Sequence, residues 1–446
     1  MDNIILNDKQ QEMVKALDEK LKAILNDPAI PVPGCGAMAF QDGKLLYQNC
    51  MGYRTFDASG KVGVKPFTAD TRYRIASISK MFSALCVMRL VEQGTVDLDE
   101  DVSKYLGFTL RNPNYPEQKI TLRMLMSHTS TIRDGSGYMI APEYRIEECF
   151  LPDGKYYRGG EHFANSDDGI NREPGRFFTY ANLNYGIIGT MFERLSGLRF
   201  DEYLKKNILE PMGIGASFNV GDFDEENIGL LSPLYEAHVG DKWDPSQPWV
   251  AQVDDYKGQV QPRDKVRITD PDGNSIYADL NGYNIGNNGT LFSPQGGLRI
   301  SMNELKVLAE LYLNDGKVNG RQIVSKESLD TMFTPYWTYD RAAQNGDTYG
   351  GQMACYGPGV QTMTSEKDKD IFLKDRKVVL SGHFGEAFGL LAGLFVNRKT
   401  KMGIFYVING QGAPMSEHRG DYSGMYQWEE HLCTAILDTL FPDIRD

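Results

Sequence analysis

The chain has 446 residues, 41% of them hydrophobic, and a formal net charge of −13 at pH 7. This apolar content can fill a sizeable core, whereas the acidic balance argues against nucleic acids and anionic membranes as partners, because both require basic patches. No run of about eighteen apolar residues occurs, so no transmembrane segment is expected. The start of the sequence shows no secretory leader, which leaves the compartment open: cytoplasmic as written, periplasmic or extracellular if a leader was trimmed.

The spacing of cysteines and histidines favours neither disulfides nor a metal site. The six cysteines form no Cys-x-x-Cys pair, and the six histidines form no His-x-His or His-Glu-x-x-His pair. We therefore expect buried thiols, with Cys86 among them, and we expect no metal and no cofactor.

Hydrophobic spacing predicts the first elements. Asp8–Leu25 has the apolar period of an amphipathic helix. Two strands should follow at 35–40 and 44–51, joined by a turn at Asp42-Gly43.

Ser77-Ile78-Ser79-Lys80 comes next and opens an apolar helical run over 81–90. A serine hydroxyl needs a base beside it to act as a nucleophile, and residues three apart share one helix face, so Lys80 should lie one turn beneath Ser77. The first turn of a helix also supplies unpaired N–H groups that favour negative charge. We predict Ser77 as nucleophile and Lys80 as a candidate base. The alternative is a serine that only caps the helix.

The middle of the chain is predicted to be mainly helical. Helices are expected at 120–127, 182–195 and 200–209, with Pro211 stopping the last of them. Residues 216–290 are rich in Asp, Gly, Asn and Pro, which indicates an ordered insertion bordering a cleft. One hairpin is expected within it at 265–277, around Asp272-Gly273.

The last third returns to strands. A helix at Met302–Leu313 precedes three strand-like runs at 378–380, 389–396 and Met402–Ile408, and a final amphipathic helix spans about 426–440.

Strands near both ends and helices in the middle predict an α+β fold, an α/β sandwich whose antiparallel sheet is built from both termini and flanked by helices. We expect one catalytic unit over 1–446. Its α/β lobe would cover about 8–75 plus 290–446, its mainly helical lobe about 76–215, and the substrate would bind between them.

Two further segments carry candidate site residues. Tyr180 precedes a helix, and a phenol near an ammonium group can shuttle protons, while the Asn182 amide can hold both Lys80 and a substrate carbonyl. In the strand-rich end, His383 and Gly385 would bind substrate along a strand edge, since a strand glycine lets a ligand backbone approach closely. The N–H of Glu386 would complete an oxyanion hole with that of Ser77.

In this order, Ser77-x-x-Lys80, Tyr180-x-Asn182 and His383-x-Gly385 resemble the serine β-lactamase-like family. That family includes class C β-lactamases, penicillin-binding D,D-peptidases, D-amino-acid peptidases and family VIII esterases. Segments 125–130, 174–189 and 295–298 are also similar to family motifs, and the likeness extends over about residues 35–435.

The resemblance implies a β-lactamase/transpeptidase-like fold and acyl transfer. Ser77 would attack a carbonyl while Lys80 and Tyr180 move the proton, the amides of Ser77 and Glu386 hold the oxyanion, and water or another nucleophile releases the acyl group. Which of Lys80 and Tyr180 is the base stays open, because interacting groups titrate together.

Two departures from the family pattern carry consequences. Many members have Lys-Thr-Gly where this chain has His383-Phe384-Gly385. Phe384 has no hydroxyl and His383 is mostly neutral at pH 7, so weak carboxylate anchoring and poor β-lactam hydrolysis are expected. Thr131 stands in place of the usual glycine after His-Thr-Ser, which is expected to reshape that loop.

The sequence therefore predicts a serine hydrolase of peptidase or esterase type, acting on an amide or ester of a small-molecule or peptide substrate. One alternative is an acyltransferase using the same site, suggested by Phe384 and the aromatic residues Trp243, Trp249 and Tyr256. The others are a weak class C-like β-lactamase and a non-catalytic ligand-binding homologue. The oligomeric state is not predicted.

Overall fold

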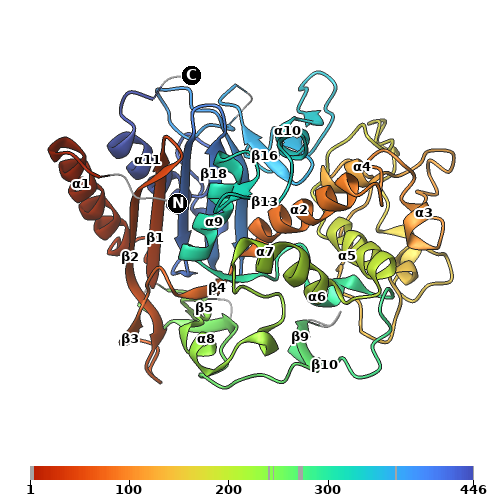
Figure 1. Ribbon diagram of the computed structural model, residues 1–446, viewed down its shortest axis with the longest axis horizontal. Helices are drawn as coiled ribbons and strands as arrows, with labels where there is room; N and C mark the ends of the chain where they lie inside the picture. The colour runs from red at the N-terminus through yellow and green to blue at the C-terminus, as the bar shows by residue number, and fades with distance from the viewer. Residues whose placement is uncertain (1–4, 240–241, 245, 270–274, 367–368, 445–446) are drawn as a thin grey trace.

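The centre of the molecule is a nine-stranded antiparallel sheet, built from both ends of the chain as predicted (Figure 1). The computed structural model describes residues 5–239, 242–244, 246–269, 275–366 and 369–444. Across the sheet the strands run in the order β14 (Trp337–Thr338), β15 (Cys355–Gly357), β16 (Val360–Met363), β17 (Leu380–Ala387), β18 (Leu390–Asn397), β19 (Met402–Ile408), β1 (Gly34–Gln41), β2 (Lys44–Phe56) and β3 (Gly63–Pro66).

Helices cover both faces of this sheet. In Figure 1, α1 lies to the left of the sheet, and α2, α4 and α5 lie to its right. The helices are α1 (Asp8–Leu25), α2 (Ser79–Glu92), α3 (Ser103–Leu106), α4 (Leu122–Met126), α5 (Leu183–Ser196), α6 (Phe200–Leu204), α7 (Glu210–Met212), α8 (Glu225–Leu230), α9 (Met302–Leu313), α10 (Lys326–Phe333) and α11 (Gln427–Leu440).

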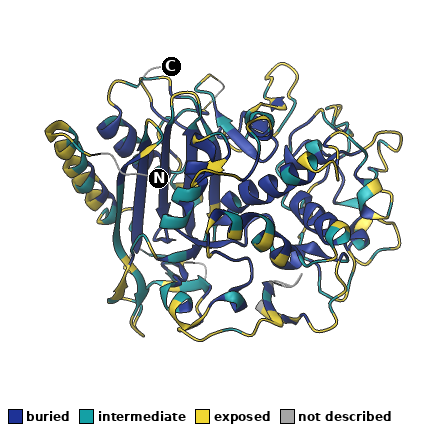
Figure 2. Ribbon diagram, in the orientation of Figure 1, coloured by how far each residue is buried: buried dark blue, intermediate teal, exposed yellow. Residues whose placement is uncertain are grey.

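The central strands are buried on both faces, which explains their nearly continuous apolar sequence (Figure 2). Along β1, Ala37 and Ala39 join the core formed with α1 and α11, whereas Met38 and Phe40 join the larger core formed with α2 and α9. This alternation is the two-residue period of a strand, and it lets one sheet hold two cores together.

Short strands form smaller sheets around the main one. β4 (Arg72–Arg74) pairs with β11 (Arg299–Ser301), and β5 (Leu234–Glu236) lies between β20 (Gly410–Gln411) and β8 (Val250–Val253). The remaining pairs are β6 (His238–Val239) with β7 (Lys242–Trp243), β9 (Lys265–Thr269) with β10 (Ser275–Asp279), and β12 (Lys317–Val318) with β13 (Arg321–Gln322). The hairpin predicted over 265–277 is present as β9 and β10, while its predicted turn at Asp272-Gly273 lies outside the described residues.

The predicted helices at Asp8–Leu25 and Met302–Leu313 are confirmed at both ends. Each begins with a reciprocal capping box, Asn7 with Gln10 and Ser301 with Glu304, which satisfies two backbone N–H groups at once.

Three predicted boundaries are wrong. The strand expected over 44–51 continues as β2 to Phe56, where it pairs with β3. The strand expected at 378–380 begins only at Leu380, because the N–H and C=O of Val378 are bonded to the Ser365 hydroxyl. Pro211 does not stop its helix, which continues through α7 and ends at the left-handed Gly213. A wider helical turn over Lys205–Leu209 places Pro211 in a first helical turn, where its missing N–H costs nothing.

All six cysteines are unpaired; five are buried and Cys50 is half-buried, in line with the thiols expected from the sequence. Within the described ranges, no helix combines the length and apolar character needed to cross a bilayer. The same residues hold no group of three or more His, Cys, Asp and Glu side chains that could bind a metal ion.

Candidate active site

A cavity of about 980 Å³ opens beside the nucleophile predicted from the sequence. Five of the predicted site residues line it, namely Ser77, Tyr180, Asn182, His383 and Glu386. The other two, Lys80 and Gly385, are buried behind its wall. The fold thus brings three distant segments of the chain to one hollow, of a size that suits a small organic substrate.

Ser77 lies in a tight turn, Ala76–Ile78, and α2 begins only at Ser79. This turn runs directly into α2, which covers the helical run predicted over 81–90. Ala76 directly before it adopts a left-handed conformation with φ 49°, which costs a non-glycine residue about 1–3 kcal/mol. Strain of this kind persists only where the surrounding structure fixes it, and it often occurs beside functional side chains.

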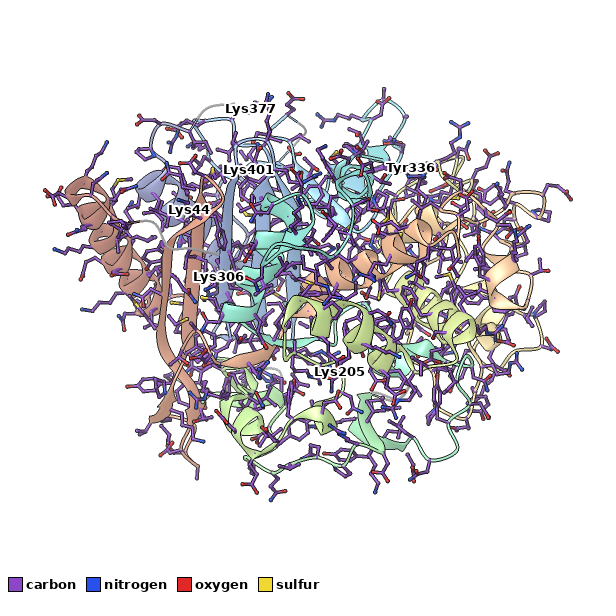
Figure 3. All side chains as sticks on the ribbon, viewed as in Figure 1. Lys44, Lys205, Lys306, Tyr336, Lys377 and Lys401 are labelled. Atoms are coloured by element: carbon purple, nitrogen blue, oxygen red, sulfur yellow. The ribbon has the colours of Figure 1, made fainter. Side chains whose placement is uncertain are left out.

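Lys80 is fully buried and makes three short contacts. Its Nζ lies 2.9 Å from Ser77 Oγ, 2.9 Å from Asn182 Oδ1 and 2.8 Å from the Gln295 carbonyl oxygen. Burial lowers the pKa of Lys80 well below its ordinary value, and the negative charge of Asp134 opposes this only in part. Lys44 and Lys377, by contrast, lie exposed at the surface (Figure 3).

Asn182 is held in one orientation by a residue that the sequence did not single out. Its Nδ2 donates to Asp134 Oδ2 at 3.0 Å, and the N–H of Leu183 donates to Asp134 Oδ1 at 2.9 Å. A carboxylate only accepts hydrogen bonds, so the amide nitrogen faces Asp134 and the amide oxygen faces Lys80. The carboxylate also lies at the N-terminus of α5, where negative charge is favoured.

Tyr180 presents a neutral phenol to the nucleophile. Burial raises the pKa of Tyr180 well above its ordinary value, although a hydrogen bond with Ser77 opposes the shift. Its ring stacks on His128 with centroids 4.2 Å apart, and the Lys80 amine lies 4.7 Å from the ring centroid. The phenol is therefore neutral at pH 7, with its proton available for donation.

His383 lies in β17 with both ring nitrogens engaged. Nδ1 bonds to the Phe384 carbonyl, which can only accept, so Nδ1 carries the proton and Nε2 accepts from the Tyr356 hydroxyl at 2.6 Å. Burial and the nearby Lys80 lower the pKa of His383 to about 3. The ring is therefore neutral and supplies no charge to a substrate carboxylate.

Gly385 allows a close approach within the protein, and its part in binding a ligand backbone stays a prediction. A Cβ at this position would lie 2.6 Å from the carbonyl oxygen of Ile75. Only glycine lets β17 run this close to the turn that carries Ser77. Glu386 follows at the cavity wall, and its part in an oxyanion hole stays a prediction.

Thr131 keeps the backbone conformation that glycine would have. Its φ is 70°, which is unusual for a β-branched residue, and its hydroxyl accepts a hydrogen bond from Asn112 Nδ2 at 3.0 Å. This contact helps to hold the left-handed turn, and the reshaping of the loop relative to the family stays a prediction.

Comparisons with known proteins agree with this geometry. The family model described as "Beta-lactamase" matches residues 17–424. The protein flp of Staphylococcus aureus (strain N315) is 26% identical over 208 residues, which are 47% of this chain and 38% of that protein. The ML-236A carboxylate methylbutanoyltransferase mlcH of Penicillium citrinum is 30% identical over 198 residues, 41% of this chain and 46% of that protein. The chain thus spans less than half the length of these curated relatives.

Solved structures show the same fold. The octameric penicillin-binding protein homologue from Pyrococcus abyssi superimposes with a TM-score of 0.59 at 23% identity, over 95% of this chain and 76% of that one. The D-amino acid amidase from Ochrobactrum anthropi SV3, complexed with D-phenylalanine, gives a TM-score of 0.59 at 17% identity, over 97% and 99%. With a family match that spans nearly the whole chain, this protein belongs to the β-lactamase family.

Proposed function

We propose that this protein is a serine hydrolase that cleaves an ester or amide bond through an acyl-enzyme intermediate. The observation that carries the proposal is the set of partners around Lys80 Nζ. The oxygens of Asn182 and Gln295 can only accept, so when Lys80 is a neutral amine they take up both of its N–H bonds. Its lone pair then faces Ser77 Oγ, which is the arrangement of a general base and its nucleophile.

The reaction follows from these contacts. Ser77 Oγ attacks the substrate carbonyl as its proton passes to Lys80, and the backbone N–H groups of Ser77 and Glu386 hold the oxyanion. The neutral phenol of Tyr180 gives a proton to the leaving group, and Lys80 restores that proton. Water, activated in the same way, then releases the acyl group. Of the two candidate bases, the raised pKa of Tyr180 and the lowered pKa of Lys80 favour Lys80.

Acyl transfer to an alcohol or amine is a second candidate, because the fungal relative is named as a methylbutanoyltransferase. The aromatic residues Trp243, Trp249 and Tyr256 do not add support, since none lines the cavity. Product analysis with and without added alcohols separates the two reactions. Efficient β-lactam hydrolysis is not proposed, because the neutral His383 and the apolar Phe384 offer no cationic anchor.

Covalent labelling tests the proposal. A fluorophosphonate probe is expected to label the protein with one equivalent, on the peptide containing Ser77, as read by mass spectrometry. Ser77→Ala should abolish the label. Ser136→Ala is the matched control, since Ser136 lines the same cavity and donates to the Glu161 carboxylate, not to a lysine amine. Labelling that survives in Ser77→Ala, or fails in Ser136→Ala alone, would contradict the proposal.

Asp134→Asn tests the electrostatic setting of Lys80. Because the Asp134 charge raises the pKa of Lys80, its removal should shift the rising limb of the pH–rate profile to lower pH. A several-fold loss of kcat is expected as well, since Asn182 loses its charged acceptor. Asp347→Asn is the control, because that carboxylate accepts from Thr179 and lies outside the Lys80 contacts. A profile that stays in place would show that Asp134 does not act on Lys80.

A further inference from the structure

We propose that this cavity selects substrates carrying a carboxylate, and that Arg74 binds that carboxylate. The inference rests on the proposed serine hydrolase and names the class of its substrate. The anchor lies three residues before the nucleophile, on β4, and not at the His383-Phe384-Gly385 position.

Arg74 lines the cavity with much of its donor capacity unused. Its Nε donates to the Gly296 carbonyl at 3.0 Å, which fixes the plane of the guanidinium group. Its two terminal nitrogens have no acceptor among the described residues, and no carboxylate there forms an ion pair with it. Burial and the charge of Arg299 lower the pKa of Arg74 to about 10, so it stays charged at neutral pH. The guanidinium is half-buried, and the charge of Asp254 acts on it without a hydrogen bond, so its terminal N–H groups remain open to an anion.

The charges around the cavity favour an anion even though the protein as a whole is acidic. Four arginines and three carboxylates line it. The carboxylate of Asp254 is paired with Arg299, whose guanidinium group donates to both carboxylate oxygens at 2.9 and 2.8 Å. Burial raises the pKa of Glu429 to about 8, so this carboxyl is mostly protonated at pH 7. The charges of Arg74 and Arg419 then face the one remaining carboxyl group, that of Glu386, in a chain of net charge −13, and low-dielectric walls concentrate such a field.

Phe388 covers Arg74 and is held in place by a strained turn. The guanidinium carbon of Arg74 lies 5.4 Å from the Phe388 ring centroid. Phe388 has a φ of 54° and is 41% exposed, although it is a large aromatic residue. The following Gly389 fixes the turn, because a Cβ there would lie 2.1 Å from the Tyr235 carbonyl oxygen. An aromatic cover shields the guanidinium from water and strengthens its attraction to an anion.

The planar guanidinium fork also suits a carboxylate, which it can bind through two parallel hydrogen bonds. His383 cannot do this, because its ring is neutral and both of its nitrogens are engaged. Arg74 lines the cavity together with Ala76 and Ser77, and both terminal nitrogens of its guanidinium group remain available to bind a carboxylate.

Matched ester pairs test this inference. One pair, p-nitrophenyl hydrogen glutarate and p-nitrophenyl pentanoate, places the carboxylate in the acyl part. The other pair, the pentanoyl esters of 4-hydroxybenzoate and of 4-hydroxybenzamide, places it in the leaving group. In at least one pair, Arg74→Gln should lower the ratio of kcat/KM values, anionic over neutral, by about 10-fold or more. Arg321→Gln, which removes an exposed arginine on β13, should leave both ratios as in the wild type. Ratios unchanged by Arg74→Gln would overturn the inference.

A binding measurement separates this inference from the proposed hydrolysis. Glutarate should raise the Tm of the wild type and of Ser77→Ala, and it should not raise the Tm of Arg74→Gln. Glutarate binding without turnover of any ester would refute the hydrolase and retain the anion site. Ester turnover with no selective effect of Arg74→Gln, and no effect of glutarate on Tm, would refute the anion site and retain the hydrolase.

Discussion

Lys80→Arg is expected to lower kcat/KM for an activated ester by about 10²- to 10⁴-fold. Arginine keeps the positive charge but does not give up its proton, so it cannot take the proton of Ser77. Lys80 is buried and its amine lies 2.9 Å from Ser77 Oγ, which leaves no room for a bulk-water base to replace it. Steady-state hydrolysis of p-nitrophenyl pentanoate by the wild type and the variant measures the effect.

The pH dependence of kcat/KM of the wild type provides a second test of Lys80 as the base. If Lys80 is the base, the active form carries the neutral amine, so kcat/KM should rise as pH increases through the pKa of Lys80. Because burial lowers that pKa well below 10.5, the rise should be complete well below the pH at which a free lysine titrates. The Lys80→Met variant should not show this rise of kcat/KM with pH.

A double variant checks that the two side chains act as a unit. Lys80→Arg combined with Ser77→Ala should be no slower than Ser77→Ala alone, since residues of one catalytic unit are not additive. Full activity in Lys80→Arg, or losses that multiply in the double variant, would exclude Lys80 as the base.

The parts of the site that could be predicted are those encoded locally. Ser77 and Lys80 are three residues apart, so helical geometry alone brings them together even though the turn begins differently than expected. Tyr180 and Asn182 directly precede a helix with a strong apolar pattern. The sheet could be predicted as well, because β1, β18 and β19 are long apolar runs near the two ends of the chain.

Other functional residues could not be predicted, since their roles depend on contacts across the fold. Asp134 reaches Asn182 from a loop 48 positions earlier, and nothing in its local sequence distinguishes it from a surface aspartate. Gln295 contacts Lys80 through its backbone carbonyl. Every residue has this group, so the sequence gives no signal for the contact. The close approach of Gly385 to Ile75 could not be predicted either, because Ile75 comes from a distant segment. Local pattern thus predicted the chemical groups, and tertiary contacts determine their orientation and pKa.

The ion pair of Asp254 with Arg299 gives the largest effect expected on stability. Asp254→Ala should lower the free energy of unfolding by about 3–5 kcal/mol, because it leaves the Arg299 charge buried and unpaired. The two side chains are 0% and 6% exposed and are joined by two hydrogen bonds. Asp168→Ala, which breaks an exposed pair with Arg172, should cost far less. Urea unfolding at pH 7, followed by circular dichroism, compares the variants.

A second substitution and a pH series show whether the pair itself is responsible. Asp254→Ala with Arg299→Met should be more stable than Asp254→Ala alone, since the unpaired charge is gone. Burial by itself raises the pKa of Asp254, but Arg299 and Arg74 hold it below its ordinary value. The contribution of Asp254 should therefore be complete above the ordinary pKa of an aspartate and be lost as pH falls through the folded-state pKa. If Asp254→Ala unfolds at the wild-type urea concentration, the pair does not stabilise the wall of the cavity, and the charge of Arg299 must be balanced by another group.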